Sequence, residues 1–83
     1  MIRVVVADDE TPAREKLERW VAEQPDMAVV GSAEDGLSAA QCIARLRPDV
    51  AFLDVQMPTL SGLQVAAQLE PSSALLIVFV TAF

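Results

Sequence analysis

Four short apolar runs divide the chain, and they limit its fold more than any other feature of the sequence. They cover residues 2–7, 27–30, 50–53 and 75–80. Runs of this length, bounded by turn-forming residues, are typical of strands buried on both faces of a parallel sheet. The segments between them are long enough for crossover helices. The order β-α-β-α-β-α-β therefore predicts an α/β, doubly wound parallel sheet.

The intervening segments carry signals for helix ends. Thr11 is expected to cap the first helix, with Pro12 at its first helical position. Asp35 and Gly36 form a turn into the second helix, and residues 71–73 are expected to end the third. Apolar residues recur at helical spacing within each segment. The expected inner faces comprise Ala13, Leu17, Trp20, Val21 and Gln24 in the first helix, Leu37, Ala40, Ile43, Ala44 and Leu46 in the second, and Leu63, Val65, Ala66 and Leu69 in the third.

Acidic residues directly follow two of the apolar runs. Asp8 and Asp9 come after the first run, and Asp54 comes after the third. In the strand order 2-1-3-4, ligands bind at the switch point between strands one and three, beyond their carboxyl ends. Three carboxylates gathered there repel each other unless a cation intervenes, and Mg²⁺ accepts both carboxylate and phosphate oxygens. The pattern predicts a magnesium site in which one carboxylate is able to attack phosphorus, with the Thr81 hydroxyl beside the transferred group.

A structural interpretation of the same residues stays open. Acids that precede a helix often cap it and complement its dipole, and Asp8-Asp9-Glu10 taken alone fits that role. Asp54 lies well ahead of the next helix, so capping explains it less well. Thr81 taken alone is more often a strand-end hydroxyl bonded to backbone. The coincidence of both acidic groups at one switch point favours a site.

Composition excludes several other functions. The 83 residues allow one small domain, and the net charge of −6 with scattered basic residues argues against nucleic-acid binding by this segment. There is no histidine and only Cys42, so zinc or iron sites built from soft ligands are excluded. No apolar run approaches the ~18 residues of a membrane span, and a lone cysteine fits a reducing cytoplasm. We therefore expect a cytoplasmic protein with no membrane partner.

Three segments form a recognisable combination, namely Val4–Glu10, Phe52–Pro58 with Gly62, and Val80–Ala82. In this order and on these elements they resemble the receiver domain of two-component response regulators. The resemblance implies a flavodoxin-like fold and a histidine kinase as the phosphate donor. The acidic start and the Val-Gln-Met-Pro loop look most like receivers attached to LytTR-type DNA-binding domains. DNA would then be bound only through an output domain that these residues do not include.

The resemblance also implies a role for each site residue. Asp54 matches the residue that accepts the phosphoryl group. Asp8 and Asp9 match the acidic pair that holds Mg²⁺ together with Asp54 and the backbone carbonyl of Gln56. Thr81 matches the switch hydroxyl that moves to bond the phosphoryl group. The domain is expected to catalyse only its own phosphorylation and dephosphorylation and is not otherwise an enzyme.

The sequence departs from the family at its end. A family member continues into a fourth helix, a fifth strand with a phosphate-pairing lysine, and a fifth helix, whereas this chain stops at Phe83. Residues 1–83 are thus expected to be the N-terminal part of a single receiver domain. Two hypotheses follow: a phospho-accepting signalling domain, or a phosphorylation-incompetent module that only self-associates. The edge strand at residues 75–80 or the uncovered sheet faces would then make a homodimer.

Overall fold

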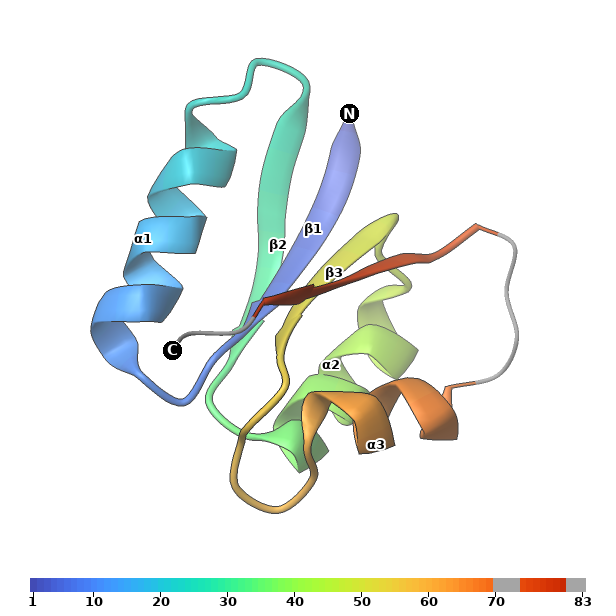
Figure 1. Cartoon of the computed structure of the whole chain (residues 1–83). Coiled ribbons are helices and arrows are strands. Elements are labelled where there is room, and N and C mark those ends of the chain that lie inside the picture. The colour runs from blue at the N-terminus through green and yellow to red at the C-terminus, as the bar shows by residue number, and fades with distance from the viewer. Residues whose placement is uncertain (70–73, 81–83) are drawn as a thin grey trace.

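Four parallel strands form one sheet in the computed structural model, which describes residues 1–69 and 74–80 (Figure 1). The strands are β1 (Ile2–Ala7), β2 (Met27–Ala33), β3 (Val50–Asp54) and β4 (Leu76–Val80). Their spatial order is β2-β1-β3-β4, and every neighbouring pair is parallel. The predicted flavodoxin-like order 2-1-3-4 is therefore confirmed. No fourth helix or fifth strand occurs within these described residues.

Helices cover both faces of the sheet (Figure 1). They are α1 (Thr11–Ala22) on one face, and α2 (Gly36–Leu46) and α3 (Gly62–Gln68) on the other. Alternate residues of β1 serve the two faces, because successive side chains of a strand point in opposite directions. Val4 and Val6 pack on the α1 side, whereas Val5 and Ala7 pack on the side of α2 and α3. Within the described ranges, no helix is long and apolar enough to cross a membrane.

α1 begins one residue earlier than the sequence predicts. Glu10 is the capping residue, although its side chain makes no capping hydrogen bond, so Thr11 is the first helical residue and Pro12 the second. The backbone N–H of Arg14 donates to the Glu10 carbonyl at 2.9 Å, which starts the helical pattern there. The N–H of Glu10 in turn donates to Asp8 Oδ1 at 2.9 Å. A site residue therefore fixes where the helix starts.

β2 extends past its predicted end at Val30. The strand continues to Ala33 because Gly31, Ser32 and Ala33 pair with the last three residues of β1. A register shift between Val4 and Val5 of β1 accommodates this longer partner. The extension brings the β2–α2 connection level with the carboxyl end of β1.

The predicted inner face of α2 is confirmed at Ala40, Ile43 and Leu46, which pack on the core, and is wrong at two positions. Leu37 is 49% exposed and Ala44 is also exposed, whereas Ala39 and Cys42 are buried together with Ile43. The small side chains of Ala39 and Cys42 allow α2 to lie close against the sheet, and interiors are packed too densely to leave that space empty. Cys42 is a free, buried thiol and acts as a core residue.

α3 starts at a complete capping box. The hydroxyl of Ser61 accepts from the backbone N–H of Gln64 at 3.1 Å, and the Gln64 side chain accepts from the N–H of Ser61 at 2.9 Å. Val65 is fully buried, but Leu63 is 57% exposed and so does not belong to the inner face as predicted. The predicted end of the helix at residues 71–73 lies outside the described residues.

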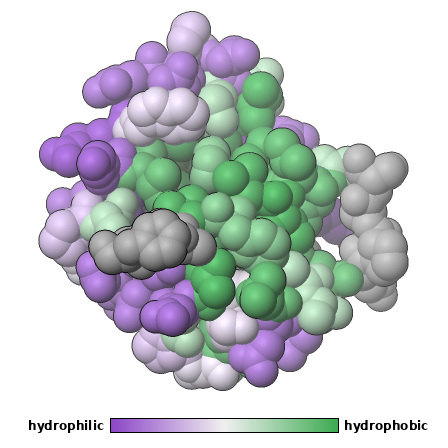
Figure 2. Space-filling model, viewed as in Figure 1, coloured by the Kyte–Doolittle hydropathy of each residue, from purple (hydrophilic) through white to green (hydrophobic). Residues whose placement is uncertain are grey.

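The face that carries α1 is only partly covered. The ring of Trp20 meets Phe52 of β3 edge-on, with 6.2 Å between centroids and an interplanar angle of 85°. Trp20 is nevertheless 48% exposed, and Leu76 of β4, on the same face, is 61% exposed. Phe79 of β4 pairs with Leu53 and so lies on the face of α2 and α3, where it is 40% exposed. Figure 2 shows hydrophobic residues gathered in the middle of the viewed face, where β3 and β4 lie, and hydrophilic residues around the margin. β4 is also the edge strand of the sheet.

Candidate functional site

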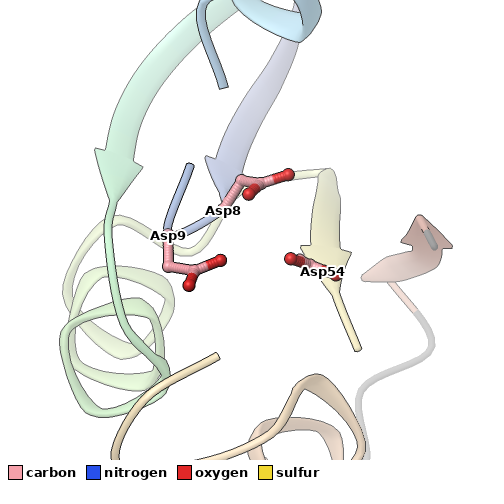
Figure 3. Close-up of side chains that lie close together, drawn as sticks. All are labelled: Asp8, Asp9 and Asp54. Carbon is pink, nitrogen blue, oxygen red and sulfur yellow. The ribbon is translucent and has the colours of Figure 1, made fainter. Parts of the chain in front are cut away.

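Three carboxylates meet at the carboxyl ends of the two central strands. Ala7 of β1 pairs with Leu53 of β3, so Asp8 and Asp54 follow directly at one level of the sheet. One oxygen each from Asp8, Asp9 and Asp54 lies within 4.8 Å of the others. Figure 3 shows the three side chains pointing into a common space. The sequence-based prediction that the two acidic groups meet at the switch point is confirmed in this geometry.

Asp8 is held firmly in place. It is the one buried charged residue of the described chain, at 6% exposure. Its N–H donates to the Ala33 carbonyl at 3.1 Å, and its Oδ1 accepts from the Glu10 N–H at 2.9 Å. Its carbonyl accepts from Arg14 Nη1 at 3.0 Å. Both the backbone and the carboxylate of Asp8 are therefore fixed, by the end of β2 and by the start of α1.

Arg14 is a structural partner of the site that the sequence analysis did not identify. Its guanidinium joins the β1–α1 loop to the β2–α2 loop, because it contacts the Asp8 carbonyl and pairs with Glu34 at 3.3 Å. Only 12% of the Arg14 side chain is exposed. A basic residue in the first turn of a helix is unfavourable to the helix dipole. That unusual position is the signal by which the sequence could have indicated a role for Arg14.

Asp54 combines partial burial with nearby negative charge. Burial raises the pKa of the Asp54 carboxyl above its usual value, and the charges of Asp8 and Asp9 raise it further. A hydrogen bond from the Gln56 N–H to Asp54 Oδ1, at 3.3 Å, opposes these effects. On balance the pKa of Asp54 is raised, so folding destabilises the ionised form of this carboxyl group. Binding of a proton or a cation would relieve that destabilisation.

Two shallow grooves border the acidic group. Asp9 and Gln56 line one of them, an open groove of about 490 Å³ beside the loop that follows β3. Asp8 and Asp54 line the other, of about 330 Å³, which reaches along α1 to Trp20 and to Val80 of β4. Two grooves thus border the acidic group, although Asp8 itself is almost fully buried. The predicted switch residue Thr81 lies outside the described residues.

The donor set fits a hard divalent cation. Carboxylate oxygens are the ligands that Mg²⁺ prefers. The oxygens of Asp8, Asp9 and Asp54 lie within 4.8 Å of one another and would together hold such an ion. The raised pKa of Asp54 agrees with such an ion, because a cation would relieve the repulsion that causes part of the shift.

A doubly wound sheet with an acidic group at its switch point defines this chain as a receiver-type α/β domain. Residues 4–83 match the family described as the response regulator receiver domain. The chain therefore belongs to the response regulator receiver domain family of two-component systems.

Similar proteins agree with this membership. An uncharacterised response regulatory protein of Yersinia pestis is 47% identical over the whole chain, and the transcriptional regulatory protein BtsR of Escherichia coli is 45% identical. The chain covers 35% of each, so it spans about a third of the length of these relatives.

Solved structures support the same fold. The response regulator domain of Thermotoga maritima CheB has a TM-score of 0.91 at 37% identity, covering 98% of this chain and 60% of that chain. The response regulatory domain of Klebsiella pneumoniae mrkE has a TM-score of 0.85 at 30% identity, covering 99% and 68%.

Proposed function

We propose that this receiver domain takes a phosphoryl group from a histidine kinase onto Asp54, with Mg²⁺ held by Asp8, Asp9, Asp54 and the carbonyl of Gln56. The observation that carries the proposal is the meeting of three carboxylates within 4.8 Å at the ends of β1 and β3. Charge neutralisation and positioning are what phosphoryl transfer chiefly requires of a protein.

The proposed transfer uses the Asp54 carboxylate as the nucleophile. One of its oxygens bonds to phosphorus while the phosphorus–nitrogen bond to the donor histidine breaks, and the electron pair stays on the leaving imidazole nitrogen. The product is an aspartyl phosphate. Mg²⁺ held by these residues would supply positive charge to the phosphate oxygens and would lower the repulsion from the carboxylates. Asp8, fixed by hydrogen bonds to both of its backbone groups and to Oδ1, keeps the metal-binding geometry rigid.

Thr81 is proposed as the switch hydroxyl. Val80, its predecessor in the sequence, is the β4 partner of Asp54 in the strand pairing. The described part of β4 therefore ends beside Asp54. We propose that the hydroxyl of the next residue in the sequence, Thr81, hydrogen-bonds a phosphoryl oxygen on Asp54.

The larger protein is proposed to be a cytoplasmic regulator of transcription. The chain spans about a third of relatives such as BtsR, which is named a transcriptional regulatory protein. We propose that residues 1–83 are the N-terminal part of one receiver domain and that a separate output domain of LytTR type contacts DNA. The composition of this segment, with a net charge of −6, agrees with DNA contact lying elsewhere.

The alternative function, a module that only self-associates, is less favoured because the acidic group is complete. One observation still favours a homodimer. β4 is an edge strand, and its residues Leu76 and Phe79 are exposed. Light scattering of residues 1–83 at micromolar concentration tests this contact. A dimer mass supports pairing through β4 or the open sheet face, and a monomer mass rejects it.

Incubation of the full-length protein with Mg²⁺ and a small acyl phosphate donor tests the proposed function. Intact mass is expected to show the gain of one phosphoryl group. Asp54→Asn should abolish the gain, whereas Asp26→Asn, which changes an exposed acid before β2, should leave it unchanged. Equal labelling of Asp54→Asn and the natural protein would reject Asp54 as the acceptor.

A further inference from the structure

The N-terminus of α2 is bound to the loop that follows Asp54. The N–H of Gly36 donates to the Pro58 carbonyl at 3.0 Å, and the N–H of Leu37 donates to Thr59 Oγ1 at 2.9 Å. Initial N–H groups of a helix have no partner within the helix. Here two of them are satisfied by residues of the β3–α3 loop, more than twenty positions away in the sequence.

Asp35 completes this arrangement from the other side. Its Oδ1 caps α2 by accepting from the Ser38 N–H at 2.8 Å, and it also accepts from the Thr59 hydroxyl at 3.3 Å. The Thr59 hydroxyl thus donates to Asp35 and accepts from Leu37 at once. These hydrogen bonds lower the pKa of Asp35, with that from Ser38 the largest cause, so the carboxylate is the form that the fold selects.

The backbone at this contact is unusual in two ways. Thr59 has a φ of 68°, a left-handed conformation that a β-branched residue rarely adopts. Gly36 approaches the carbonyl of Leu60 so closely that a Cβ on it would overlap that group. Only the surrounding contacts can hold Thr59 in such a conformation. We name Asp35, Gly36 and Thr59 the α2–loop clasp.

The clasped loop is tied to the acidic site at its other end. The N–H of Gln56 donates to Asp54 Oδ1 at 3.3 Å, and the N–H of Gly62 donates to the Val55 carbonyl at 2.9 Å. A Cβ on Gly62 would overlap the Asp54 carbonyl, so the two ends of the loop touch. A short loop fixed in this way cannot shift at Thr59 without moving Gln56.

We propose that Thr59 and Asp35 are positioning residues that set the Mg²⁺ affinity of the acidic site by holding the β3–α3 loop against α2. Neither side chain belongs to the group of three carboxylates. Their effect passes through the backbone of Gln56, which lines the groove beside Asp9. The inference rests on the proposed function, because it assumes that the carboxylates bind Mg²⁺.

Titration of the full-length protein with MgCl₂, followed by the amide resonance of Gln56, tests the clasp. Thr59→Val keeps the shape and branching of the side chain but removes the hydroxyl that joins Leu37 to Asp35. We expect its dissociation constant for Mg²⁺ to rise about tenfold, the lower end of the range for lost supporting contacts at metal sites. Thr59→Ser restores the hydroxyl and should stay within about twofold of the natural protein.

Ser38→Ala is the matched control. The Ser38 hydroxyl donates to Oδ2 of the same Asp35 at 3.2 Å, but its bond stays within α2 and its cap and does not reach the loop. This variant is expected to keep the natural Mg²⁺ affinity even if its melting temperature falls. Equal losses of affinity in Ser38→Ala and Thr59→Val would show that only the stability of α2 matters, and would overturn the inference.

Asp35→Asn keeps a side-chain cap for α2 and weakens the charged acceptor of the Thr59 hydroxyl. It provides a second test if Thr59→Val does not fold, with an expected rise of about threefold in the dissociation constant. If the variants of Thr59 and Asp35 that fold bind Mg²⁺ with the natural affinity, the inference is overturned but the proposed function is not. Failure of the natural protein to respond to Mg²⁺ would overturn the proposed function, and the inference with it.

Discussion

The carboxylates of Asp8 and Asp54 face each other across the junction of β1 and β3, and the charge of Asp8 contributes to raising the pKa of Asp54. The two residues follow strands that pair directly, at Ala7 and Leu53. Burial of Asp54 makes a larger contribution to the same shift. Without a cation, the folded chain is therefore strained electrostatically at the position that the proposed function uses.

Neutralising Asp54 should stabilise the metal-free protein. Asp54→Asn removes a partly buried negative charge from beside two others, so we expect the melting temperature at pH 7 in a chelating buffer to rise by roughly 2–4 °C. Asp26→Asn is the control for removing an exposed acid. A lower melting temperature for Asp54→Asn would contradict the repulsion described above.

The same repulsion predicts a pH dependence of the free energy of unfolding. Because the pKa of Asp54 is raised on folding, the folded state holds this proton more tightly than the unfolded state does. The stabilisation of the folded state by Asp54 is therefore fully present below the ordinary pKa of 3.8. It is lost as the pH rises through the raised pKa of the folded protein.

Urea unfolding of the natural protein and of Asp54→Asn, without metal, measures this dependence. The advantage of the variant should appear as the pH rises above about 4 and stay constant near neutrality. An advantage that is as large at pH 3 as at pH 7 would show that charge is not its cause.

Removal of either neighbouring acid should weaken metal binding. Asp8→Asn and Asp9→Asn are each expected to raise the Mg²⁺ dissociation constant by about tenfold or more, since each deletes one charged oxygen ligand. The fluorescence of Trp20 is a suitable signal in residues 1–83, because this residue lines a groove with Asp8 and Asp54. Unchanged Mg²⁺ titration curves in both variants would show that Asp8 and Asp9 do not bind the metal.

The sequence predicted the three carboxylates of the site better than it predicted the residues that hold the surrounding loops in place. Asp8, Asp9 and Asp54 were accessible to prediction because the carboxyl ends of neighbouring parallel strands must meet at one edge of the sheet. Thr59 was not, because its hydrogen bonds join loops that no local pattern relates. For Arg14 the only signal in the sequence was its unfavourable position in the first turn of α1. Thr59 has a left-handed backbone conformation, which β-branched residues rarely adopt. Residue propensities therefore argue against this conformation at Thr59.

The helix faces show a second limit of the sequence. Hydrophobic periodicity selected Leu37 and Ala44 for the buried face of α2, whereas Ala39 and Cys42 are buried. Periodicity identifies an apolar stripe, but close packing of a helix on a sheet selects side chains small enough to fit. That choice depends on the neighbouring strands and not on the helix alone.

Gly62 is expected to tolerate no side chain. Gly62→Ala places a methyl group against the Asp54 carbonyl, so backbone must move, and we expect a loss of about 1–3 kcal/mol in the free energy of unfolding. Urea denaturation measures it. Ala66→Gly, at a half-buried position of the same helix, controls for the general effect of exchanging glycine and alanine in α3. A Gly62→Ala variant as stable as the natural protein would mean that the two ends of the loop do not touch as described.

Asp54 is proposed as the phospho-acceptor of a magnesium site completed by Asp8 and Asp9. The most direct measurement is to treat the full-length protein with an acyl phosphate donor, reduce the product with borohydride, and map the modified residue by peptide mass spectrometry. Reduction of an aspartyl phosphate gives homoserine at the acceptor position. We expect homoserine at position 54 in the presence of Mg²⁺, and little or none in a chelator or in Asp9→Asn. Homoserine at another aspartate, or equal modification of Asp54 without Mg²⁺, would contradict this assignment.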